Sequence, residues 1–402
     1  MVLTVLLAFP TVLPESPTSL VPGVEDIEEG TAEILETISE NLEIEHQLEQ
    51  AKDGEHTTAQ IPDLTDTADN NPAKWKAYML ELINIERSAA GLGPVVQGDN
   101  PAAQIHADSM LGGCYSSHWG HDGLKPYMRY SLAGGYQSNA ENVSGSNYCI
   151  KSWENYVGTP LERDIQESMD GFMQSPGHRD NILDPHHAAV NLGLAWDDYN
   201  MKVVQHFEYG YVVFEEIPAI RSGILSFSGT ALNEAGFRSA NDLRVQIHYD
   251  PPPHNLTTGQ VARTYCSGSG IAVAALVAPL PPGAYTGSYQ VTATSCPDPY
   301  NVPADAPPPA SHDEAASIFE QAYLASTSAP ATTRTVPIHI ASEWSISESD
   351  FTVEADIGTV LQEHGPGVYT IMVWGTASGE YVAIAEQSIF YETDPPETYR
   401  QP

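Results

Sequence analysis

Basic residues are scarce in this sequence. Its 402 residues include 16 Lys and Arg against 53 Asp and Glu, which gives a formal net charge of −37 at pH 7. A surface with this balance repels the phosphate backbone of nucleic acids and the anionic headgroups of membranes. The composition therefore excludes nucleic acid as a partner and indicates a solvated acidic surface.

Long apolar runs are also missing. No stretch approaches the roughly 18 uncharged apolar residues that a membrane-spanning helix needs, so we expect no transmembrane helix. Residues 1–14, MVLTVLLAFPTVLP, have the length of a signal-peptide core, but no Lys or Arg precedes Lys52. We interpret them either as a degenerate signal segment or as the result of a start assigned too late.

Cysteine is rare, and its spacing excludes the common metal and redox motifs. The chain has four cysteines, and no two of them form a CxxC pair. We expect the cysteines nearest in sequence to form two local disulfides, Cys114 with Cys149 and Cys266 with Cys296. Disulfides persist in oxidising compartments, so this pattern favours an extracellular or cell-surface location; four buried free thiols are the alternative.

The chain divides into segments of different character. Residues 15–71 combine an acidic stretch that has Ile and Leu at helical spacing with a polar stretch that has none, and we expect an acidic linker or an amphipathic helix. Within residues 72–215, apolar spacing and Gly or Pro stops predict helices over 72–90, 101–111 and 161–173. The runs AAVNLGLAWDD and KVVQHFEYGYVVF then predict two strands, so this domain is of the α+β class.

Residues 216–402 contain short β-rich runs, among them GILSFSG, LRVQIHYD, YTIMVWG and YVAIAEQSIFY. Each run is bounded by Gly, Pro, Asn or Asp, which is typical of an all-β sandwich or barrel. A stretch rich in Pro, Ala, Ser and Thr, residues 297–334, interrupts the pattern. We interpret it as a long excursion, because strands resume after it, with a domain boundary as the alternative.

Three motifs between residues 114 and 178 carry candidate chemistry. They are CYSSHWGHDGLKPYMR with His118, GGYQSNAENV with Glu141, and MQSPGHRDNIL with His178. Taken alone, each of these side chains is more often structural than functional. Three further histidines, His121, His186 and His187, are expected on the solvated surface. Two glycosylation sequons occur, at Asn142 and Asn255, and we expect the one at Asn255, in a Pro-rich turn, to be accessible.

In their order, these motifs resemble those of the CAP superfamily, which includes cysteine-rich secretory proteins, insect venom antigens and plant pathogenesis-related proteins. The resemblance covers residues 72–215 and also uses LINIERSAAGL, HADSML and VVQHFEYGY; SPGHRDNIL has the form common in prokaryotic members. It implies a three-layer α-β-α sandwich whose cleft carries two histidines and usually two acids. His118 and His178 would be the histidines and Glu141 the first acid, while Ser175 occupies the second acid's position. The Asn142 sequon, which belongs to the AENV motif, would be packed in that fold.

Two neutral imidazoles suit Zn²⁺ or another divalent ion, and Glu141 could orient one ring or take a proton from bound water. With only two protein ligands, such a site would bind metal weakly. We therefore favour a secreted, non-enzymatic module that binds a ligand or protein partner, with lipids among the ligand classes that the resemblance implies. The alternatives are a metal-dependent hydrolase that uses the same cleft, with Glu141 as catalytic candidate, and a structural envelope protein.

Overall fold

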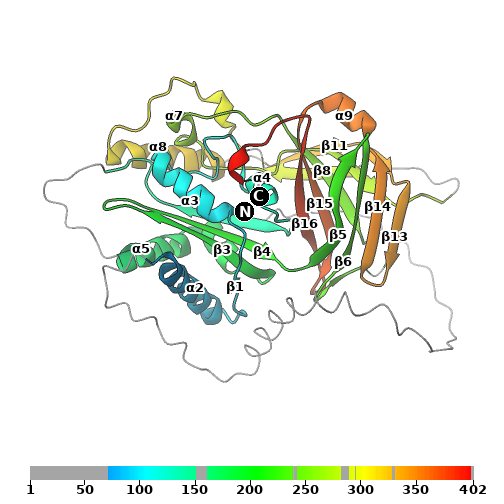
Figure 1. Cartoon of the computed structure of the whole chain (residues 1–402), viewed down its shortest axis with the longest axis horizontal. Coiled ribbons are helices and arrows are strands. Elements are labelled where there is room, and N and C mark those ends of the chain that lie inside the picture. The colour runs from blue at the N-terminus through cyan, green and yellow to red at the C-terminus, as the bar shows by residue number, and fades with distance from the viewer. Residues whose placement is uncertain are drawn as a thin grey trace. The chain divides into compact units, whose positions relative to one another are not determined.

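The structure is a computed structural model, and it describes residues 71–150, 161–237, 239, 242–281, 289–294, 296–327 and 331–399 (Figure 1). These residues belong to one compact unit. The predictions for residues 1–14, a signal segment, and 15–71, an acidic linker or helix, lie outside the described residues except for Asn71. None of the described helices has the length and apolar character that a membrane span requires.

A four-stranded sheet organises the first part of the structure. Its strands are β1 (Val96–Gln97), β2 (Asn139–Ser144), β3 (His187–Trp196) and β4 (Met201–Tyr209), in the order β1-β3-β4-β2. Strand β1 runs parallel to β3, and the other pairs are antiparallel. The predicted strand pair joined by a turn is present as β3 and β4, but the second predicted run is broken at Gly210, and its end, VVF, belongs to β5 (Val212–Arg221) of another sheet. Strand β2, formed by the AENV motif, was not expected as a strand.

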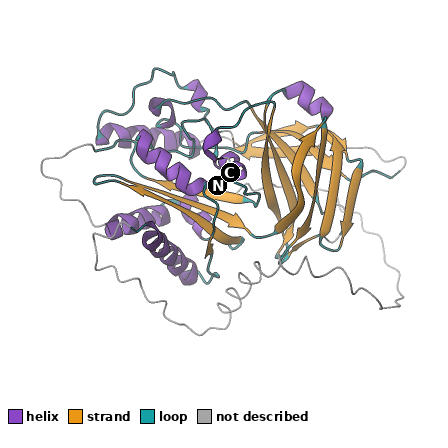
Figure 2. Ribbon diagram, viewed as in Figure 1, coloured by secondary structure: helices purple, strands orange, loops and turns teal. Residues whose placement is uncertain are grey.

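Helices cover both faces of this sheet (Figures 1 and 2). In Figure 1, α2 (Pro72–Ala89) and α5 (Leu161–Gln174) lie on one side of β3 and β4, and α3 (Ala102–Gly113) lies on the other. Helix α2 begins where the Asn71 side chain accepts a hydrogen bond from the Ala73 amide, and its buried stripe includes Trp75 and Met79. The predicted α-β-α sandwich of the α+β class is confirmed.

Two short helices complete this part of the chain. Helix α4 (Pro126–Leu132) follows the His118 motif, and α6 (Pro176–Ile182) follows α5 directly. Both begin with a proline at the first helical turn, where its missing N–H costs nothing. Neither was predicted, because seven residues are too few to show a helical apolar period.

The second part is a β-sandwich. One sheet has the order β13-β14-β6-β5 and consists of β5 (Val212–Arg221), β6 (Ile224–Ala231), β13 (Glu343–Ser347) and β14 (Asp350–Asp356). The other has the order β12-β9-β8-β15-β16, with β7 (Ala235–Gly236) also paired to β15. Its strands are β8 (Arg244–Asp250), β9 (Ile271–Val277), β12 (Ile338–Ile340), β15 (Gly367–Ala377) and β16 (Glu380–Tyr391).

The two sheets share one buried core, which includes Phe227 and Phe351 from the first sheet and Val245 and Ile371 from the second. Alternate residues of β6 are buried, as expected for a strand with one face in the core. A separate pair, β10 (Tyr289–Thr294) and β11 (Ala331–Val336), lies between β9 and β12 in the chain order. The predicted sandwich-like C-terminal region is therefore present.

Helices also occur within the β-rich part: α7 (Thr258–Val261), α8 (His312–Thr327) and α9 (Gly358–His364), with short 3₁₀ turns at Pro299–Asn301 and Glu397–Tyr399. Helix α8 lies within the predicted excursion. The Ser311 hydroxyl accepts a hydrogen bond from the Glu314 amide at its start, and Ala315 and Ala322 are buried. This helix was not predicted, because the prolines around it indicated an irregular segment.

Polar contacts fasten the helical part to the sandwich. The Lys125 ammonium, just before α4, lies 2.6 Å from a carboxylate oxygen of Asp250 at the end of β8. The Tyr127 hydroxyl donates to the other oxygen at 2.7 Å. Both predicted disulfides, Cys114–Cys149 and Cys266–Cys296, are present, with Cα atoms 5.6 and 5.4 Å apart.

Candidate functional site

Glu141 is held by β2 and α4 at the centre of the candidate site. The alternation of β2 turns it towards Arg129 of α4, whose guanidinium donates to the two carboxylate oxygens at 2.7 and 2.6 Å. Their side chains are 1% and 0% exposed. Burial alone would raise the pKa of Glu141, but Arg129 and the hydrogen bond from His118 lower it well below its usual value. Glu141 is therefore ionised.

His118 lies beside this ion pair, in the loop between α3 and α4. Its Nδ1 is 2.9 Å from Glu141 Oε1, and its backbone carbonyl accepts a hydrogen bond from Arg129. Because an ionised carboxylate only accepts, Nδ1 carries the proton and donates. This leaves Nε2 as the nitrogen with a free lone pair in the neutral ring, and no described residue hydrogen-bonds it.

His178 lies in α6, which packs against β2. Its backbone carbonyl accepts a hydrogen bond of 3.1 Å from Asn142, which also donates to Gln205. Asn142 is therefore packed, as expected for this sequon, and the exposed Asn255 is the accessible one. Burial, reinforced by the nearby His118, lowers the pKa of His178 to about 3, so its imidazole is neutral at physiological pH.

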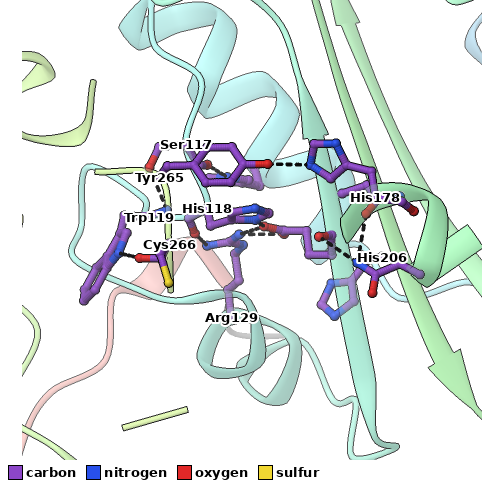
Figure 3. Close-up of polar contacts among 12 residues, drawn as sticks. Ser117, His118, Trp119, Arg129, His178, His206, Tyr265 and Cys266 are labelled. Atoms are coloured by element: carbon purple, nitrogen blue, oxygen red, sulfur yellow. Dashed lines mark hydrogen bonds and ion pairs between the residues drawn. The ribbon is translucent and has the colours of Figure 1, made fainter. Parts of the chain in front are cut away.

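Tyr265 joins the two histidines, and no motif in the sequence pointed to it. Its hydroxyl and His178 Nε2 share a hydrogen bond of 3.0 Å, and its ring meets the His118 ring edge-on at a centroid distance of 5.6 Å. Figure 3 shows Tyr265 beside His118 with its hydroxyl directed at His178. Tyr265 comes from the segment between β8 and β9, so only the tertiary fold brings it here. The one signal nearby was its neighbour Cys266, through the expected disulfide.

Ser175 occupies the position of the second acid, and Glu167, which lies earlier in the chain on α5, does not replace that acid. Ser175 is the N-cap residue of α6, and its side chain makes no capping hydrogen bond. Glu167 is exposed and pairs with Arg163 one helical turn away on α5. Of Glu141 and Glu167, only Glu141 contacts a cleft histidine.

The expectation that three further histidines are solvated is wrong for His187. It is buried, its ring stacks on Phe207 at 5.0 Å, and its Nδ1 bonds the Asn181 carbonyl at 2.8 Å. As the first residue of β3, it belongs to the face that α2 covers. The expectation is also wrong for His186, whose side chain is 9% exposed and bonds the Tyr211 hydroxyl. His121 is half-buried and stacks on Tyr115.

As the cleft is arranged, its residues do not fit a metal ion. Within the part of the chain that the structure describes, no group of three or more His, Cys, Asp or Glu side chains is placed to hold one. His118 Nε2 is oriented as a ligand nitrogen, with Glu141 behind Nδ1, but His178 Nε2 is engaged by Tyr265. A metal bridging the two rings would first have to displace Tyr265.

Comparisons with known proteins concern mainly the first part of the chain. Residues 80–207 match the family model CAP, the cysteine-rich secretory protein family. An extracellular protein containing an SCP domain from Bacillus anthracis str. Ames is similar at 19% identity and a TM-score of 0.25, over 35% of this chain and 45% of that one.

The CAP domain of enterococcal PrgA is similar at 18% identity and a TM-score of 0.25, over 36% of this chain and 65% of that one. The aligned part therefore spans less than two thirds of either solved chain. No curated protein matches the sequence.

Proposed function

Because this chain carries a CAP domain at residues 80–207, we propose that it acts outside the cell as a non-enzymatic module that binds a ligand or a protein partner. The two disulfides support export, since such bonds persist in oxidising compartments. In this proposal the CAP domain supplies the binding cleft, and the β-sandwich is an accessory part fastened to it.

The state of Glu141 is the observation that carries the non-enzymatic interpretation. Both of its oxygens accept hydrogen bonds from Arg129, and one also accepts from His118. A general base works best when its pKa lies near the working pH, whereas these contacts hold the pKa of Glu141 far below that range. Glu141 is thus suited to fixing the orientation of His118 and poorly suited to accepting a proton from water.

A hydrolase is the principal alternative, and turnover measurements separate it from the proposal. The purified full chain, with and without added Zn²⁺, is incubated with fluorogenic peptide and ester substrates, beside Glu141→Gln and His118→Ala. We expect all of these proteins to give the buffer rate. Turnover by the wild type that Glu141→Gln abolishes would establish catalysis and contradict the proposal.

Binding needs its own measurement, and lipid is the ligand class to try first. A surface of net charge −37 is repelled by anionic vesicles, so the suitable probe is a neutral vesicle of phosphatidylcholine with cholesterol. We expect co-sedimentation or sterol transfer that is lost in His118→Ala. If that variant instead binds normally but melts earlier, the His118–Glu141 group serves the fold alone, as in a structural envelope protein.

In this proposal a divalent ion can bind both cleft histidines only by displacing Tyr265 from His178 Nε2. Two imidazoles, one of them already bonded to Tyr265, would bind the ion with an affinity no tighter than micromolar. A micromolar Kd corresponds to a binding free energy of about 8 kcal/mol. Calorimetric titration with Zn²⁺ measures this directly.

A further inference from the structure

We propose that residues 264–268 form a tethered plug in the cleft, and that a cleft ligand binds by displacing Tyr265. This inference rests on the proposed function, in which the cleft between His118 and His178 receives the ligand. The inference adds that the Tyr265 side chain occupies this cleft until a ligand displaces it.

The Tyr265 side chain forms the tip of the plug and contacts both cleft histidines, as a bound ligand would. The Tyr265 hydroxyl occupies His178 Nε2 at 3.0 Å, while its ring packs edge-on against His118 (Figure 3). Two surface cavities, of about 330 and 400 Å³, occur elsewhere on the described part of the molecule, and neither is lined by these two histidines. With Tyr265 in place, His178 Nε2 is closed to any other molecule.

The base of the plug is fastened to the CAP domain through its backbone. The carbonyls of the alternate residues Thr264, Cys266 and Gly268 each accept a hydrogen bond from a side chain between residues 117 and 125. The donors are Ser117 Oγ at 2.9 Å, Trp119 Nε1 at 3.1 Å and Lys125 Nζ at 2.8 Å. The backbone is thus fixed independently of the Tyr265 side chain, so the ring can rotate away while the tether holds.

Among the described residues, the surface helix α8 packs against the outer side of the plug. Phe319 and Tyr323 of α8 meet the Tyr265 ring edge-on at centroid distances of 5.2 and 5.3 Å. Phe319 itself is 42% exposed. The Cys266–Cys296 disulfide ties the plug to the segment that leads to α8. Beyond the cleft histidines, the described aromatic partners of Tyr265 thus come from this helix, so the ring can leave the cleft without opening the buried core.

The hydrogen bond between Tyr265 and His178 is weaker than the ion pair between Arg129 and Glu141 behind it. Tyr265 and His178 share one hydrogen bond between neutral groups, because burial raises the pKa of Tyr265 and lowers the pKa of His178 to about 3. Behind it, Arg129 Nη2 donates to both carboxylate oxygens of Glu141 in a fully buried ion pair. Neutral hydrogen bonds contribute less than charged ones, so a ligand displaces Tyr265 while the pair behind it stays in place.

Carbethoxylation of histidine by diethyl pyrocarbonate, mapped by mass spectrometry, tests the plug in the full chain with its disulfides intact. The reagent modifies neutral imidazoles that solvent can reach. We expect Tyr265→Ala to raise the rate at His178 about tenfold, and Tyr265→Phe, which keeps the ring but loses the hydroxyl, about threefold. The rate at the exposed His254 should not change. Tyr391→Ala, which removes a half-buried tyrosine of β16, is the matched control.

A second measurement titrates the same variants with Zn²⁺ by calorimetry. Tyr265→Ala frees His178 Nε2, so its affinity for Zn²⁺ should exceed that of the wild type about tenfold, or 1.4 kcal/mol. An unchanged rate at His178 in a Tyr265→Ala protein that melts cooperatively would overturn the plug. If Tyr265→Ala does not fold, an unchanged rate of carbethoxylation at His178 in Tyr265→Phe would overturn the plug. A raised rate at His178 without binding of Zn²⁺ or of neutral vesicles supports the plug and counts against the proposed function.

Discussion

The guanidinium of Arg129 donates to both carboxylate oxygens of Glu141, at 2.7 and 2.6 Å, where neither side chain reaches solvent. This pair connects α4 to β2, and it also sets the ring of His118 through Glu141 Oε1. One buried contact therefore serves the fold and the cleft together, and its removal should affect both.

Arg129→Met should destabilise the protein by about 3 kcal/mol or more, because it leaves the Glu141 carboxylate buried without its counter-charge. The double variant Arg129→Met with Glu141→Leu should recover part of that loss, since it removes both charges. Urea unfolding of the single and double variants measures this. A double variant less stable than Arg129→Met would contradict the account. Exposed Arg163, which pairs with Glu167, is the control, and Arg163→Gln should change stability by about 0.5 kcal/mol at most.

Asp250→Asn should weaken the junction between the CAP domain and the sandwich. It removes the carboxylate that pairs with the buried Lys125 ammonium and accepts from the Tyr127 hydroxyl. We expect a loss of about 3 kcal/mol, since a buried charge is left without its partner. Denaturant unfolding measures the loss, and limited proteolysis should cut earlier in this variant. Equal stability of Asp250→Asn and the wild type would show that the ion pair does not fasten the two parts.

Glu386 of β16 should oppose folding at alkaline pH. Burial, and the nearby Asp250, raise its pKa to about 8, and among the described residues its Oε1 has no hydrogen-bond partner. Because its folded pKa is raised, its contribution to stability is complete below the unfolded value of 4.5 and is lost as pH rises through 8. Glu386→Gln should therefore be more stable than the wild type at pH 8, by roughly 2 to 4 kcal/mol. Thermal melts across this pH range test the prediction, and an unchanged difference between the two proteins from pH 4 to 8 would refute it.

His187 should make the protein sensitive to acid. Burial lowers its pKa to about 4 from 6.5, so the unfolded chain binds a proton that the folded chain does not. Its contribution is complete above pH 6.5 and is lost as pH falls through 4. His187→Asn, which keeps an amide near the Asn181 carbonyl, should lose stability less steeply than the wild type over this interval, by about 3 kcal/mol in total. The stability of both proteins is measured by urea unfolding between pH 7 and 4. If stability falls equally in the two proteins over this range, His187 does not cause the acid sensitivity.

Removing the Cys114–Cys149 disulfide should destabilise the CAP domain by about 3 kcal/mol, because the bond closes a loop of 35 residues. The double Cys→Ala variant, melted under oxidising conditions, measures this. The wild type under reducing conditions should approach the melting temperature of a variant that lacks all four cysteines. No change on reduction would mean that neither disulfide contributes.

The CAP assignment was predictable because its motifs are local. His118, Glu141 and His178 each lie in a run of residues whose order along the chain identifies the family, and the match at residues 80–207 confirms that resemblance. The same holds for the long helices and for most strands of the sandwich, where apolar period and turn residues act over short distances. The positions of the four cysteines along the chain were sufficient to predict both disulfides.

The tertiary structure decided what those side chains do. Arg129 was one letter of the first motif, and only the packing of α4 against β2 makes it the partner of Glu141. Tyr265 lies 87 residues from His178, in a segment without a motif, and the fold alone brings its hydroxyl to the cleft. The sequence determined the elements because local contacts determine them, whereas the occupant of the cleft depends on a contact between distant segments, which no local pattern records.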